Sequence, residues 1–159
     1  MIDKKAGTRP AFTMIELIFV IVVIGILSAI AIPRLAASRD DAVLVKAKSQ
    51  VSAIRSGIAM QKNKRLLEGT TPALLPSLDS VTNYNLANQR LFNYADGNSS
   101  NVLEYPIYSK INSDGAWVKT AANKYSIYLR NTTVSFDYNS TSGIFDCSHT
   151  DQNCKDLTQ

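Results

Sequence analysis

The first third of the chain is dominated by one long apolar run. Leu17 to Ile32 are sixteen consecutive residues without a charge, and Ser28 is the one polar side chain among them. As a helix, the segment from Phe12 to Ile32 would extend roughly 30 Å, the thickness of a bilayer core. The run is longer than that of a secretory signal peptide and leads directly into a charged helical pattern. We therefore predict a transmembrane helix that is retained rather than removed.

Beyond residue 33, apolar positions recur at steps of three and four, which is typical of one face of a helix. This face consists of Leu44, Ala47, Val51, Ile54 and Ile58. Lysines and arginines occupy the other faces, and Gly69 followed by Pro72 predicts the end of the helix. We expect one helix from Phe12 to about Leu67, whose second half needs a partner to cover its apolar face.

The remaining residues predict a small β-rich head. We expect loops over 70–101 with a short helix near 85–93, and a strand over 102–110. Alternating apolar and polar positions predict further strands over 124–130 and 134–138, joined by a turn at 131–133. A turn at 139–143 leads into a third strand at Ile144 and Phe145. The fold class is α+β, with a long helix packed against a small antiparallel sheet.

Composition and charge narrow the function classes. A chain of 159 residues has room for one folded domain at most, which excludes a large multi-domain enzyme.

Residues 1–11 carry a charge of +2, residues 34–67 carry +6 and residues 68–159 carry −3. The basic flank before the apolar run should stay in the cytoplasm, so the head should lie across the membrane. The basic charge of residues 34–67 suits a membrane surface or an acidic protein surface. Nucleic acid is a weaker candidate partner, because the charges surround the helix and no aromatic residues are interleaved for stacking.

Glu16 stands out because a carboxylate in an apolar helix is costly, about 2.5–3.5 kcal/mol at mid-membrane. Such a residue either faces a partner charge or lies solvated among the lipid headgroups. Spacing alone leaves both explanations open.

The segment Ala11-Phe12-Thr13-Met14-Ile15-Glu16-Leu17, followed by Gly25 and Pro33, resembles the N-terminus of type IV pilins and type II secretion pseudopilins. The resemblance covers residues 4 to about 42. It implies cleavage by a prepilin peptidase between Ala11 and Phe12 and N-methylation of Phe12, although the family usually has Gly where this chain has Ala11. The corresponding divisions are a leader (1–11), a transmembrane and assembly helix (12–33), a stalk (34–67) and a head (68–159).

The resemblance also implies roles for three residues of the apolar helix. Glu16 would pair with the new terminal amine of a neighbouring subunit, which offsets the cost of desolvation only when both charges are present. Gly25 lies four positions before Ala29, a spacing that allows close helix approach. Pro33 removes a helical hydrogen bond, so Gly25 and Pro33 mark an expected kink or a weak segment that stretches in the filament.

Cys147 and Cys154 are the only cysteines, and a head outside the cytoplasm favours a disulfide between them. The alternative is a metal site formed by Cys147, His149, Cys154 and one of three aspartates, Asp146, Asp151 or Asp156. His149 is the only histidine, and no phosphate loop or paired-carboxylate motif is present, so we expect neither an enzyme nor a cofactor. Asn98 and Asn139 each stand in an Asn-x-Ser/Thr site with an aspartate two residues before the asparagine. These two sites could carry glycans, but ordinary polar turns are the favoured interpretation.

These features predict a subunit of a bacterial type IV filament, specifically a pseudopilin of a type II secretion or DNA-uptake system. Its expected partners are other pilin-like subunits in a homo- or heteropolymer, the prepilin peptidase, the inner-membrane assembly machinery and the lipid bilayer. Two alternatives remain: a pilin of an extended surface pilus for adhesion or motility, and a membrane-anchored binding module that never polymerises. The first would place the protein on the cell surface, and the second would leave it a monomer.

Overall fold

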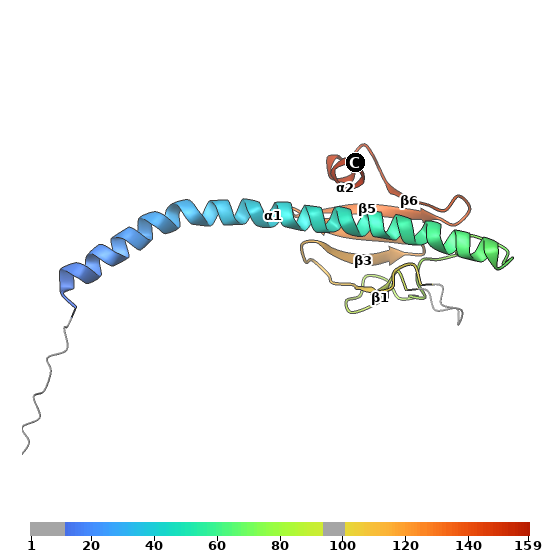
Figure 1. Ribbon diagram of the computed structural model, residues 1–159, viewed down its shortest axis with the longest axis horizontal. Helices are drawn as coiled ribbons and strands as arrows, with labels where there is room; N and C mark the ends of the chain where they lie inside the picture. Colours follow the sequence, from blue (N-terminus) through green and yellow to red (C-terminus); the bar gives the residue numbers. More distant parts are fainter. Residues whose placement is uncertain (1–11, 94–100) are drawn as a thin grey trace, which may run out of the picture. The chain divides into compact units, whose positions relative to one another are not determined.

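The computed structural model describes residues 12–93 and 101–159, except for the side chains of residues 33 and 35–38 (Figure 1). The predicted leader, including Ala11, and the Asn98 site lie outside the described residues. Within the described residues, two helices and six strands follow one another. They are α1 (Met14–Leu67), β1 (Arg90–Leu91), β2 (Ile107–Tyr108), β3 (Ala116–Ala121), β4 (Lys124–Leu129), β5 (Thr132–Asn139), β6 (Ile144–Cys147) and α2 (Gln152–Thr158). The chain forms two compact units, Met1–Arg39 and Asp40–Gln159.

Helix α1 ends where the sequence predicts. The Thr70 N–H donates to the Arg65 carbonyl at 2.9 Å, and the Gly69 N–H donates to the Leu66 carbonyl at 3.2 Å. Gly69 has φ +68°, the left-handed conformation that glycine adopts without a steric cost. Together these bonds form a Schellman motif, which satisfies the last carbonyl groups of the helix.

Strands β3 to β6 form an antiparallel meander in the order β3-β4-β5-β6. The α+β fold is confirmed, with four strands in this sheet instead of the three predicted. The predicted three-residue turn at 131–133 is instead a two-residue loop at 130–131, because Leu129 pairs with Thr132. Both loop residues, Arg130 and Asn131, have positive φ, as a type I′ hairpin requires.

The segment between α1 and β3 differs most from expectation. The predicted helix over 85–93 is wrong: Asn85, Asn88 and Phe92 all have positive φ, which interrupts any helix. The predicted strand over 102–110 is reduced to β2. This strand pairs with β1 in a separate two-stranded sheet, and Pro106 immediately before it has no N–H to extend the pairing.

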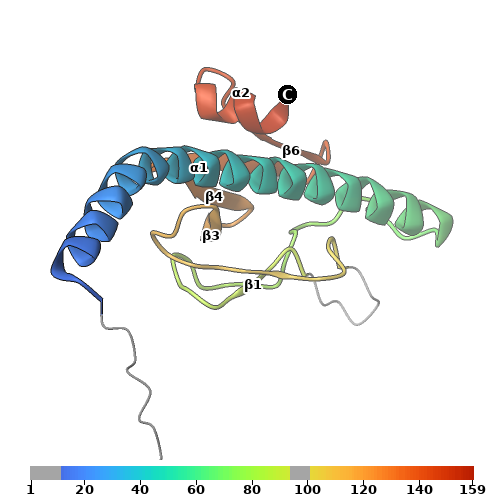
Figure 2. The same cartoon turned by 60° about the vertical axis from the view of Figure 1, so that its left-hand side comes forward.

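The core of the unit 40–159 lies between α1 and the four-stranded sheet, and Figures 1 and 2 both show this part of the helix lying along the sheet. Four of the five residues on the predicted face of α1 are buried, and Leu44 is half-buried. The prediction that the sheet covers this face is confirmed. The aromatic residues of the core are Phe92, Trp117, Tyr125, Phe136, Tyr138 and Phe145.

A buried ion pair ties the loop after α1 to β3. Lys119 Nζ lies 2.6 Å from Asp79 Oδ1, and the two side chains are 3% and 0% exposed. Lys119 Nζ also donates to the Val81 carbonyl at 2.8 Å, while the Val81 N–H donates to Asp79 Oδ1. A buried charge pair is tolerated only when further hydrogen bonds satisfy both groups, as they do here.

Candidate functional site

The N-terminal end of α1 brings Phe12, Thr13 and Glu16 together. Thr13 Oγ1 accepts the Glu16 N–H at 3.3 Å, and the Thr13 carbonyl accepts the Leu17 N–H at 3.2 Å. Thr13 is therefore the N-cap of α1, and Thr-x-x-Glu is the sequence of a capping box. The sequence analysis missed this role, although the spacing of Thr13 and Glu16 shows it.

Glu16 lies in the first turn of α1, where a helix presents its unpaired N–H groups. The partial positive charge at this end favours a carboxylate there. Phe12, immediately before the cap, is 81% exposed. An amine at Phe12 and the carboxylate of Glu16 would thus both lie at an accessible helix end.

The segment Met14–Ile32 is long and apolar enough to cross a membrane, with a mean hydropathy of 3.0, and none of it is buried within the chain. Its large apolar side chains are exposed on all sides of the helix, from Val23 at 37% to Met14 at 78%. Apolar surface of this extent requires lipid or other protein to cover it. A signal sequence near the N-terminus can have the same length and composition. The segment is consistent with a protein that crosses the membrane once.

The two residues of the expected kink lie within α1. A Cβ added at Gly25 would meet nothing within 4 Å, so this position leaves room for a neighbouring helix. The helical backbone continues through residue 33, whose side chain is outside the description. The kink and the weak segment stay predictions.

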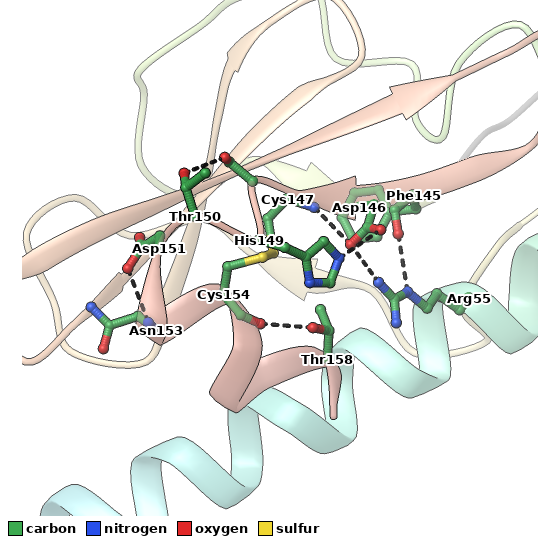
Figure 3. The surroundings of a disulfide bond; sticks show 11 residues. Arg55, Phe145, Asp146, Cys147, His149, Thr150, Asp151, Asn153, Cys154 and Thr158 are labelled. Carbon is green, nitrogen blue, oxygen red and sulfur yellow. Dashed lines mark hydrogen bonds and ion pairs between the residues drawn. A yellow bond between two sulfur atoms is a disulfide. The ribbon is translucent and has the colours of Figure 1, made fainter.

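A disulfide joins Cys147, at the end of β6, to Cys154 in α2, with Cα atoms 5.9 Å apart (Figure 3). Helix α2 was not predicted from the sequence. Asp151 is its N-cap, and the Asp151 carboxylate accepts the Asn153 N–H at 2.9 Å. Cys154 and Leu157 are buried in the core. The disulfide thus fixes α2 beside the end of β6.

Beside the disulfide, Asp146 lies between two cationic or potentially cationic groups. Arg55 Nη2, from α1, lies 2.8 Å from Asp146 Oδ1, and His149 Nε2 lies 3.1 Å from Asp146 Oδ2 (Figure 3). Burial alone would raise the pKa of Asp146, but the hydrogen bonds from His149 and the Cys147 N–H, together with the Arg55 guanidinium, lower it below its ordinary value. Arg55 Nε also donates to the Phe145 carbonyl at 3.0 Å and so occupies the outer edge of β6.

The metal site considered as an alternative would need Cys147 and Cys154 as ligands, and the disulfide occupies both sulfurs. Oxygen, nitrogen and sulfur atoms of Asp146, His149 and Cys154 lie within 4.8 Å of one another. However, the sulfurs of Cys147 and Cys154 are bonded to each other, so neither is available as the thiolate that binds a metal. The geometry instead describes a structural disulfide with an ion-pair network beside it.

The Asn139 site forms a turn in the structure. Asn139 is exposed, and its side-chain oxygen accepts the N–H groups of Thr141 and Ser142 at 2.9 and 3.1 Å. This Asx turn gives the residues between β5 and β6 a structural purpose.

The chain is similar to the type II secretion system core protein G of Aeromonas hydrophila. The two are 31% identical over 89 residues, which is 56% of this chain and 60% of that protein. The chain thus matches less than two thirds of its relative's length. No protein-family model matches the chain, and no solved structure matches it. The similarity and the α+β arrangement support kinship with pilin-like proteins.

Proposed function

We propose that the protein is a pseudopilin, a structural subunit that assembles through its N-terminal helix into the filament of a type II secretion or DNA-uptake system. The observation that supports this proposal most strongly is the exposed apolar span Met14–Ile32, which has a carboxylate in its first helical turn. The compact unit Asp40–Gln159 has a hydrophobic core of its own, which fits a subunit whose N-terminal helix serves for assembly. The similarity to a type II secretion core protein supports the same assignment.

The N-terminal helix has two environments in this account. As a monomer, the protein spans the bacterial inner membrane once, with its N-terminus in the cytoplasm and its head in the periplasm. Prepilin peptidase cuts between Ala11 and Phe12, and Phe12 is methylated. The inner-membrane machinery then moves the apolar helix from lipid to the filament core, where the helices of other pilin-like subunits cover it.

Glu16 sets the register of this assembly. Cleavage before Phe12 creates a positive amine, and the Glu16 carboxylate of an adjacent subunit neutralises it. Each charge is costly in apolar surroundings without the other, so a subunit in the wrong register leaves two unpaired charges. Gly25 allows close approach of helices, and Pro33 weakens the helix where it leaves the bilayer.

Substitution of Glu16 tests this proposal. In cells that carry the secretion machinery, Glu16→Ala should be cleaved before Phe12 but should yield no filaments, and Glu16→Gln should fail as well, since it keeps the shape and loses the charge. Glu104→Ala removes an exposed carboxylate from the head and serves as the matched control. Normal filament yield from Glu16→Ala would refute the assembly role.

A further inference from the structure

A pocket of about 210 Å³ opens on the face of the four-stranded sheet that points away from α1. Trp117 and Lys119 of β3 are buried on the core side, so the alternating residues Ala116, Val118 and Thr120 lie on the other face and line the pocket. Residues of β4 and β5 complete its floor. The pocket is smaller than the sites of drug-sized ligands, which occupy about 300–1,000 Å³, so it suits a single small ring.

Two loop segments form the walls of the pocket, and hydrogen bonds hold both of them to the outer edge of β3. The Asn85 N–H donates to the Lys119 carbonyl at 2.8 Å, and the Lys110 N–H donates to the Trp117 carbonyl at 3.1 Å. Asn85 and Asn112 have φ +56° and +51°, a left-handed conformation that asparagine adopts more readily than most residues. Because main-chain bonds fix both loops, the pocket is formed before any ligand binds.

The walls and the floor offer polar groups without partners. The side-chain amides of Asn85 and Asn112 and the hydroxyls of Thr120 and Thr133 line the pocket. Within residues 12–93 and 101–159, none of these four side chains forms a hydrogen bond. Amides and hydroxyls both donate and accept hydrogen bonds, as the groups of a sugar do.

An apolar surface lies beside these polar groups. It consists of the Ala116 and Val118 side chains and the half-buried ring of Tyr128, whose hydroxyl lies 3.4 Å from Asn131 Oδ1. A flat aromatic face can pack against the C–H groups of a sugar ring. Small apolar side chains next to amides suit an acetamido group, which combines a methyl group with a hydrogen-bonding amide.

The charge of the lining favours a neutral ligand. Lys110 is the single charged residue described there, and it also borders a neighbouring groove that contains the Asp114 carboxylate. An anion would therefore find no second positive charge in the pocket. A wholly apolar ligand would leave the asparagine and threonine side chains without hydrogen bonds.

We propose that this pocket binds one ring of an N-acetylated amino sugar. The acetamido methyl group lies against Ala116 and Val118, the acetamido N–H and carbonyl bond to Asn85 and Asn112, and the ring packs on Tyr128. The interaction lies within the head and does not depend on filament assembly. Glycan strands of the bacterial cell wall and glycans attached to proteins are two sources of such a ring.

Saturation-transfer NMR of the full chain with chitotriose, a trimer of N-acetylglucosamine, tests this proposal in a detergent that has no sugar headgroup. Transfer should be strongest to the acetamido methyl groups, because one of them is buried in the pocket. Cellotriose has the same linked rings with hydroxyls in place of the acetamido groups, and it should bind at least roughly tenfold more weakly. No transfer to chitotriose, or equal binding of cellotriose, would overturn the proposal.

Two variants connect the binding to this pocket. Tyr128→Leu removes the ring, and Asn112→Asp removes an amide donor while keeping a residue that tolerates positive φ. Each should weaken binding roughly fivefold, the effect of one lost hydrogen bond or ring contact. Tyr105→Leu and Asn83→Asp make the same changes at exposed positions outside the pocket and should bind normally. Trp117 fluorescence checks that all four variants are folded, and unchanged binding by either pocket variant would overturn the assignment to this pocket.

Sedimentation with purified cell-wall sacculi identifies the source of the ring. A chain that sediments with the sacculi and is released by chitotriose would show that the cell-wall glycan is bound. A chain that binds chitotriose but stays in the supernatant would show a glycan attached to protein, and either result supports the pocket. Neither result bears on the proposed function, which Glu16→Ala tests separately.

Discussion

Gly57, on the buried side of α1, is the position at which the smallest substitution should disturb the head most. A Cβ added there would lie 2.0 Å from the Val102 carbonyl oxygen and 3.0 Å from Val102 Cγ1. The nearest atom belongs to the backbone, so rotation of a side chain cannot relieve the contact. Gly57→Ala therefore forces residues 101–103 away from the helix.

The change in the free energy of unfolding caused by Gly57→Ala is the sum of three contributions. To reach a close carbon–oxygen contact of about 3.3 Å, the Val102 carbonyl must retreat by roughly 1.3 Å. Overpacking of this kind costs about 1–3 kcal/mol. The same shift weakens the hydrogen bond that Gln61 Nε2 donates to the Asn101 carbonyl. A hydrogen bond of this kind contributes about 1 kcal/mol to stability. Alanine regains about 1 kcal/mol of helix propensity, so the net loss is about 2 kcal/mol.

Thermal unfolding of the full chain in detergent measures this loss. Trp117 is the only tryptophan and is fully buried, so its fluorescence reports on the core. For a unit of this size, Gly57→Ala should lower Tm by roughly 5–10 °C. Ser56→Ala, an exposed change in the same turn, should leave Tm unchanged or slightly raised. A Gly57→Ala protein as stable as the unsubstituted chain would show that propensity outweighs the close approach, and would refute the reasoning.

Three further predictions concern the head, and the same fluorescence assay with chemical denaturant measures each. Lys119→Met leaves the buried Asp79 carboxylate unpaired and should cost about 3–5 kcal/mol; a loss below 1 kcal/mol would contradict the importance of this pair. Replacement of both Cys147 and Cys154 by serine should lower the free energy of unfolding by about 2.5 kcal/mol, because the disulfide, with a sequence separation of 7, no longer restricts the unfolded chain. Unchanged stability of this double variant would contradict a stabilising role of the disulfide. The lowered pKa of Asp146 means that its carboxylate stabilises the fold above its unfolded pKa of about 3.9, and this contribution is lost as pH falls through the folded value. Asp146→Asn should thus be less stable at pH 7, and the difference should shrink below about pH 4; a difference independent of pH would contradict the assignment.

Much of the fold could be predicted because its signals are local. The buried face of α1 repeats every three to four residues, and β5 alternates between buried and exposed positions from Thr133 to Asn139. In β4 the apolar positions Tyr125, Ile127 and Leu129 recur at every second residue, and all three are buried. Strand β3 was missed because its second inward position is Lys119, which a sequence pattern assigns to the surface. Its burial depends on Asp79, forty residues earlier in the chain.

Other features were missed because they depend on contacts between distant segments. Nothing local to Gly57 indicates that the Val102 carbonyl lies against it. The pocket beside Tyr128 likewise forms only when the segments at Asn85 and Asn112 pack beside β3. The segment proposed for assembly differs, because its characteristic residues, from Phe12 to Glu16, are close together in the sequence. Its resemblance to a known family could therefore be recognised without the fold.

The most direct test of the central claim is the intact mass of the protein, measured separately in filaments sheared from cells and in the membrane fraction. The account predicts a chain that begins at a methylated Phe12, lacks the two hydrogens lost in the disulfide, and remains with the membranes, as expected for a pseudopilin. The same mass found abundantly in sheared filaments would contradict the pseudopilin assignment in favour of a surface pilin. A chain that still begins at Met1 would contradict processing and filament assembly altogether.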